Sequence, residues 1–165
     1  MQVKWYHSAS PTTGGEIDTS NLVGSLVEEG SQAAPTGDVA ETLTSELDGG
    51  ADTVFYRKIH AKNHEATEIR DPRLFFSMLS YPGQLSFARA SDSDTSADNW
   101  TMPYGYEDED FLSPNAIEDA VPLFADTSDL DAGDSAAIWL RFTIPDGMAS
   151  DPSATGRINL KGNVA

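Results

Sequence analysis

The chain has no cysteine among its 165 residues. Disulfides, thiol catalysis and cysteine-based zinc or iron–sulfur centres are therefore excluded. Basic residues are also scarce, with 10 lysines and arginines against 27 aspartates and glutamates, which gives a formal net charge of −17. A field of that sign repels nucleic acid and anionic membrane surfaces. We therefore expect no direct contact with nucleic acid and no membrane partner.

Long apolar runs are missing as well. The longest purely apolar stretch covers residues 136–140, far less than a membrane span requires. Residues 1–8 contain no apolar segment of signal-peptide length. These absences predict a protein that is made in a cytoplasm and stays in solution. The acidity has two explanations, both open at this point: repulsion between copies, or adaptation to salty water, in which ions screen that repulsion.

The clearest pattern that is present runs from Leu130 to Pro145. Apolar residues occupy alternate positions in it, at Ile138, Leu140, Phe142 and Ile144. A period of two predicts a strand with one buried face. Trp139 lies on the other face. We expect this side chain either to be buried between two layers or to contact a partner protein.

Similar short stretches recur along the chain, separated by turns rich in glycine, proline and aspartate. They cover residues 3–6, 38–47, 53–62, 73–80, 84–90, 121–124 and 156–161, and residues 17–27 form a strand or a bent segment. We expect residues 73–80 and 84–90 to form a hairpin. Residues 91–120 lack the alternation, so they predict a long irregular loop with one helical turn capped by Ser113.

Seven to nine short strands without helical crossovers predict an all-β fold. We expect a single domain over residues 1–165, built as one antiparallel β-sandwich of the Ig-like or jelly-roll type. The stretch from Ser8 to Gly15 has the composition of irregular backbone. Residues 1–16 are therefore expected to form an extended N-terminal arm.

No catalytic motif accompanies these strands. The chain has neither a Gly-x-Ser-x-Gly elbow nor a phosphate-binding glycine loop. Residues 92–98 begin like a calcium loop, but Ala97 and Pro103 stand where that loop needs glycine and a bidentate carboxylate. We expect a solvated turn there, and weak calcium binding stays open. The acidic run at residues 107–110 is interpreted as a charged loop face.

His60 and His64 lie four positions apart, at the end of a predicted strand. Zinc motifs with this spacing need a helix and a third ligand. Surface or cross-strand hydrogen bonds are therefore the expected role of both rings. We expect no catalytic residue, no cofactor and no metal site, and thus a protein that is not an enzyme.

Three segments stand out: the first is residues 3–10 followed by 14–18, the second is 55–63 followed by 67–76, and the third is 130–145. Together they resemble small tailed-phage virion proteins encoded near capsid genes. The third also resembles the Leu-x-x-Gly-x-Ser turn of bacterial Ig-like domains. The resemblance implies a non-enzymatic structural protein located in a virion.

Within that class, the acidity favours the capsid exterior, away from packaged DNA. We expect a capsid decoration (cement) protein that bridges capsid subunits, with the major capsid protein, other virion proteins or a second copy as partner. Aromatic side chains are favoured at interfaces. The expected contact residues are Trp5 and Tyr6 in the arm and Trp100, Tyr104 and Tyr106 in the loop. The alternatives are a neck, tail or baseplate component, or an Ig-like carbohydrate- or cell-surface-binding module.

Overall fold

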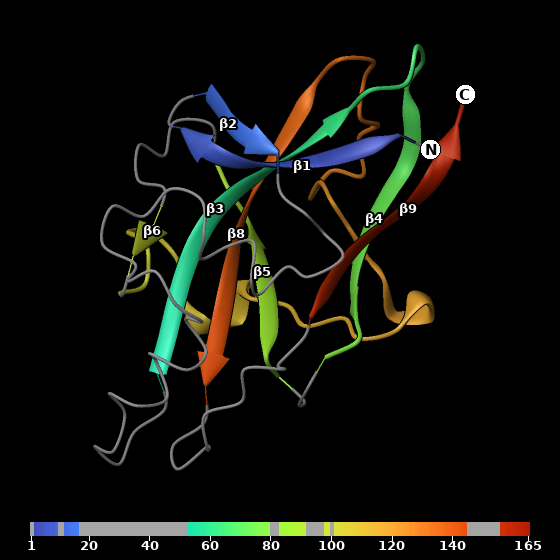
Figure 1. The fold of residues 1–165 in the computed structure, drawn as a ribbon. Helices are drawn as coiled ribbons and strands as arrows, with labels where there is room; N and C mark the ends of the chain where they lie inside the picture. Colours follow the sequence, from blue (N-terminus) through green and yellow to red (C-terminus); the bar gives the residue numbers. More distant parts are fainter. Residues whose placement is uncertain are drawn as a thin grey trace.

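A computed structural model of the chain describes residues 2–9, 12–16, 53–79, 83–91, 98–99, 101–144 and 156–165. Its strands form two antiparallel sheets that pack face to face (Figure 1). The described residues contain no α-helix, only two short 3-10 turns, η2 (Asp108–Asp110) and η3 (Ile117–Asp119). The predicted all-β antiparallel sandwich is therefore confirmed.

The two sheets differ in size. The larger sheet has the order β2-β1-β3-β8-β5, with β6 also paired to β3, and the smaller sheet has the order β7-β4-β9. The strands of the larger sheet are β1 (Val3–Ala9), β2 (Thr12–Glu16), β3 (Thr53–Asn63), β5 (Leu85–Arg89), β6 (Asp98–Asn99) and β8 (Ser135–Ile144). Those of the smaller sheet are β4 (Ile69–Ser77), β7 (Val121–Pro122) and β9 (Arg157–Val164).

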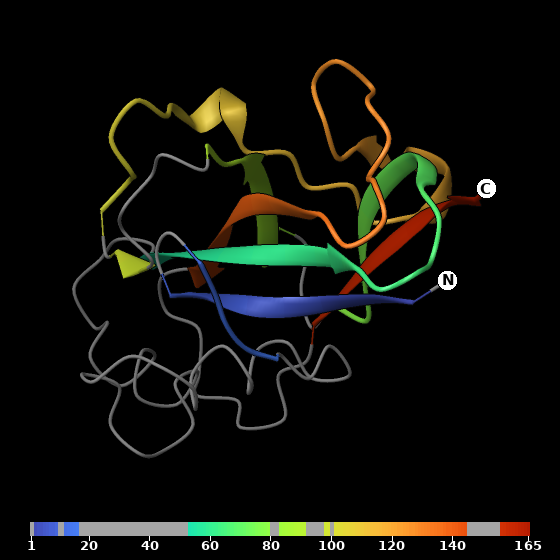
Figure 2. The same cartoon turned by 90° about the horizontal axis from the view of Figure 1, so that it is seen from above.

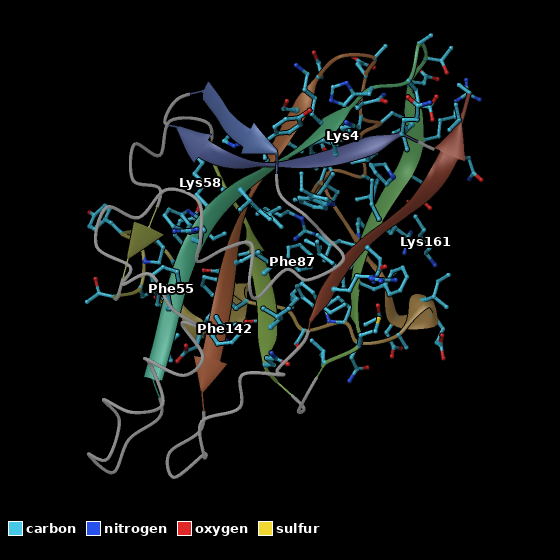
Figure 3. All side chains as sticks on the ribbon, in the orientation of Figure 1. Lys4, Phe55, Lys58, Phe87, Phe142 and Lys161 are labelled. Carbon is cyan, nitrogen blue, oxygen red and sulfur yellow. The ribbon has the colours of Figure 1, made fainter. Side chains whose placement is uncertain are left out.

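Strand β8 lies inside the larger sheet, because β3 pairs with one of its edges and β5 with the other. Its apolar residues Ile138, Leu140 and Phe142 point into the space between the sheets, as the period of two predicts. The core that they form combines residues of both sheets, among them Ile59, Leu74, Phe76, Phe87, Ile138, Leu140, Phe142 and Ile158. Figure 3 labels Phe87 and Phe142 in this layer.

Residues 3–9 and 12–16 of the expected N-terminal arm lie within the larger sheet. Strand β1 pairs with β3 from the Val3–Asn63 pair to the His7–Ile59 pair, and β2 pairs with β1. Trp5 is only 4% exposed and belongs to the core between the sheets. Burial of this large ring holds β1 in place, because exposing it would cost about 2 kcal/mol or more.

The predicted hairpin of residues 73–80 with 84–90 is wrong. Strand β4 pairs with β7 and β9, whereas β5 pairs with β8 in the other sheet. Each strand turns an apolar face to the same core, so the alternation fits both arrangements equally well. The predicted strand over 38–47 and the segment 17–27 lie outside the described residues.

Irregular backbone was predicted over residues 91–120. Within that range the structure describes a two-residue strand, β6, and then an irregular loop from Thr101 to Ala120 that contains two 3-10 turns. Ser113 does not cap the second turn. Its hydroxyl donates to the carbonyl of Leu85 at 2.6 Å, while Ala116 occupies the N-cap position of η3. Figure 2 shows this loop, in yellow to gold, beside β5 and β8 before it crosses toward β4.

Candidate interaction surface

Arg141 of β8 fixes the loop of residues 101–120 to the larger sheet. Its Nε donates to Ser86 Oγ at 2.9 Å, and its Nη1 donates to Asp108 Oδ1 at 2.8 Å. The guanidinium carbon also lies 4.6 Å from the centroid of the Phe111 ring, a cation–π arrangement. Arg141 thus joins the sheet, η2 and a buried aromatic ring through one side chain.

Beneath the loop lies a second apolar cluster, on the face of the larger sheet that points away from β4 and β9. Its buried members are Tyr56, Ala88, Phe111 and Trp139. The ring of Tyr106 covers this cluster, with its centroid 6.5 Å from Trp139 and 6.3 Å from Phe111. Of the two expectations for Trp139, burial between two layers is confirmed, because the loop supplies the second layer.

The same loop presents Tyr104 to solvent. Residues 103–106 form a β-turn in which the Tyr106 amide donates to the Pro103 carbonyl at 3.3 Å. Gly105 has a φ of 86° at the third position, where a type II turn requires a positive φ. Tyr104 stands at the second position with an exposure of 102%, while Pro103 is buried and Tyr106 is half-buried. The turn is therefore anchored at both ends around a fully solvated ring.

Four acidic residues follow this turn directly. Glu107, Asp108, Glu109 and Asp110 are all exposed, which confirms the predicted charged loop face. They have different hydrogen-bond roles, since Asp110 Oδ2 accepts from the Glu107 amide at 2.8 Å while Asp108 accepts from Arg141. We call Tyr104 together with residues 107–110 the Tyr104 surface.

The five predicted contact residues are not gathered in one place. Tyr104 and Tyr106 share one turn, but only Tyr104 is open to solvent. Trp5 lies in the core, and Tyr6 extends from the outer face of the larger sheet, where its hydroxyl shares a 2.8 Å hydrogen bond with His64 Nε2. Trp100 lies outside the described residues.

His64 forms a hydrogen bond of the kind expected, with the Tyr6 hydroxyl. The Tyr6 and His64 rings lie 5.9 Å apart, next to their hydrogen bond, and His60 is buried on β3. Across the part of the chain that the structure describes, no group of three or more histidine, aspartate or glutamate side chains is placed to hold a metal ion. Residues 92–97 of the calcium-like stretch lie outside the described residues. The backbone of Asp98, in β6, is paired with that of Arg57 in β3.

Two residues that organise this architecture were missed in the sequence. Arg141 carries a weak signal, since it is a charged residue within an apolar strand and on the same face as Trp139. Asn63 carries none, because an asparagine at a strand end is ordinary. In the structure it is fully buried, and its amide nitrogen donates to three backbone carbonyls, those of Thr67, Leu130 and Asp131.

Comparisons with protein-family models, curated proteins and solved structures return no match to this chain. What is shown is therefore an all-β fold of two packed antiparallel sheets. Among the described residues, no helix is long and apolar enough to cross a membrane. A function must be argued from the surface itself.

Proposed function

We propose that this chain is a non-enzymatic virion structural protein, a capsid decoration (cement) protein. It binds the exterior of a tailed-phage or archaeal-virus head and bridges neighbouring capsid subunits. Support comes from the resemblance of three segments to phage virion proteins, from the strong acidity and from the β-sandwich. The observation that carries the proposal is the fully exposed Tyr104 ring, held on an anchored turn beside four acidic residues.

An anchored tyrosine is suited to protein binding for two reasons. Tyrosine is enriched among the few residues that contribute most of an interface's affinity. A ring whose backbone is already fixed also loses less conformational entropy on binding. The complementary site on a capsid subunit is an apolar pocket for Tyr104 with a rim of lysine or arginine facing residues 107–110.

Co-sedimentation with empty capsids that lack this protein tests the proposal, and it is measured across a salt series. We expect saturable binding at a stoichiometry commensurate with the capsid lattice, weakening as salt screens the acidic residues. Tyr104→Ala should raise the dissociation constant by about tenfold or more, as loss of an interface anchor does. Ile117→Ala is the matched control, because Ile117 is 55% exposed and lies on η3, outside the Tyr104 surface.

A second candidate uses the same ring. An exposed tyrosine can stack on a sugar, as the carbohydrate-binding alternative requires. A glycan-binding screen with and without calcium separates the two. Glycan binding that is lost in Tyr104→Ala, together with no binding to the shell, would replace the decoration proposal. Binding to neither would direct the search to neck, tail and baseplate partners.

A further inference from the structure

The turn that presents Tyr104 is fixed to the larger sheet by the residues on either side of it. Met102 on one side and Tyr106 on the other both pack against the second apolar cluster. The largest member of that cluster is Trp139, which is completely buried on β8. Because β8 lies between β3 and β5, Trp139 cannot shift without disturbing two strand ladders. The turn therefore rests on a rigid part of the fold.

The contacts of Tyr106 are directional. Its ring makes an angle of 69° with the Trp139 ring and of 54° with the Phe111 ring. Aromatic pairs prefer such edge-to-face and tilted arrangements, whereas a methionine such as Met102 adapts to many shapes. Arg141 in turn holds Phe111, with its guanidinium carbon 4.6 Å from the centroid of that ring. The Tyr106 ring thus has one defined position.

Gly105 joins the two tyrosines and determines the angle between them. Its φ of 86° is one that other L-residues rarely adopt. A Cβ at this position would meet no heavy atom within 4 Å apart from those of its chain neighbours. Gly105 is therefore needed for its backbone conformation and not for lack of space. With Tyr106 held on the cluster and Gly105 in this conformation, the Tyr104 ring extends into solvent.

We infer that Tyr106 is the positioning residue of the Tyr104 surface. Its ring, packed against Trp139 and Phe111, sets the direction in which Tyr104 is presented and does not itself contact the partner. A ring already held in its binding direction loses less conformational freedom on binding, so Tyr106 raises affinity through Tyr104 alone. The inference rests on the proposed function for its partner, a capsid subunit, but the positioning itself is a property of the free protein.

Backbone order parameters from NMR relaxation of the free, isotope-labelled chain test the positioning without any partner. The amides of Tyr104 and Gly105 should have the value of rigid backbone, about 0.85. Tyr106→Ala should lower both below about 0.6, whereas Tyr106→Phe, which keeps the ring, should leave them unchanged. Amide exchange at Leu112, which is bonded to Phe87, verifies that the rest of the loop stays in place. Unchanged order parameters in Tyr106→Ala would overturn the inference.

Two variants at Gly105 test the turn while both tyrosines remain, and they decide the matter if Tyr106→Ala loosens the whole loop. Gly105→Ala should disorder the turn more than Gly105→Asn, because asparagine tolerates a positive φ better than alanine. Binding to empty capsids should weaken in the same order, by about tenfold for the alanine variant. The opposite order, with the larger asparagine worse, would mean that residue 105 touches the partner and would contradict positioning by the turn.

A double-mutant cycle on capsid binding separates positioning from contact. Tyr106→Ala should weaken binding by about three- to tenfold in the parent protein, but by less than about twofold in a Tyr104→Ala background. Equal losses in both backgrounds would make Tyr106 a contact residue and overturn the inference. Leu160→Ala removes a half-buried side chain of the smaller sheet, so it controls for general destabilisation and should not change the affinity. If the parent chain does not bind capsids, the proposed function fails, and the order parameters still decide the positioning.

Discussion

The side-chain amide nitrogen of Asn63 lies 2.9 Å from the carbonyl oxygen of Leu130, 67 positions away in the sequence. The same nitrogen also donates to the carbonyls of Thr67 and Asp131, and the side-chain oxygen accepts from the Glu65 amide. One buried side chain thus joins the end of β3 to the turn that precedes β8. Asn63→Ala should lower the free energy of unfolding by about 2–3 kcal/mol, because buried carbonyls lose their donor.

Asn63→Asp should cost more than the alanine variant, since it places carboxylate oxygens against carbonyl oxygens. Denaturant unfolding measures both changes. The control is Asn163→Ala, an exposed asparagine of β9, for which we expect a change within about 0.5 kcal/mol. If Asn63→Ala behaved like that control, the hydrogen bonds of Asn63 would not be important for stability.

Leu140 tests the inward face of β8. It is almost completely buried in the core between the sheets. Leu140→Ala should lower the free energy of unfolding by about 2–5 kcal/mol, through lost burial and the cavity that remains. The denaturation midpoint should fall with little change in the denaturant slope. A midpoint close to that of the parent protein would contradict the assigned face.

Arg141→Met should release the loop from the sheet while keeping a long side chain. We expect a loss of about 1–2 kcal/mol, because the cation–π contact and the bond to Ser86 are removed together with the ion pair. Amide exchange should become faster at Phe111 and Leu112. Asp108→Asn should cost less than about 1 kcal/mol, since Asp108 is 84% exposed and such ion pairs are weak. Equal losses in the two variants would show that the ion pair dominates.

Gly162 has no room for a side chain. A Cβ there would lie 2.7 Å from Ile69 Cγ2 and 3.1 Å from the Arg70 carbonyl oxygen. Gly162→Ala should therefore destabilise the fold by about 1–3 kcal/mol through overpacking. In an Ile69→Ala background, the same substitution should cost less, which a double-mutant cycle measures. Additive losses would mean that the clash with Ile69 is relieved elsewhere.

Hydrogen bonds from the Ser128 side chain and backbone amide hold the pKa of Asp126 below its ordinary value of 3.8. Because the folded pKa lies below the unfolded one, this carboxylate favours the fold above the unfolded pKa. That contribution is lost as pH falls through the folded value. Ser128→Ala should raise the pKa of Asp126 toward 3.8, as followed by NMR titration. No movement would assign the shift to the backbone amide alone.

The sequence predicted the strands better than their partners. The alternation in residues 53–62 and 138–144 located β3 and β8, and the turn-rich stretch after residue 91 located the irregular loop. The pairing of β4 with β5 was predicted incorrectly, because an alternating strand reveals that it has a buried face but not which strand lies beside it. Trp139 left two alternatives open for a similar reason, since the layer that buries it comes from a loop far away in sequence.

The period of two and the turn residues were sufficient to predict an all-β sandwich. The composition alone gave its acidity and its lack of cysteine and of long apolar runs. These features depend on neighbours along the chain, so they can be seen without a structure. The burial of Trp5, the solvation of Tyr104 and the roles of Asn63 and Arg141 could not be seen in this way. Each depends on which distant segments meet, and that is set by strand order and by the packing of the two sheets.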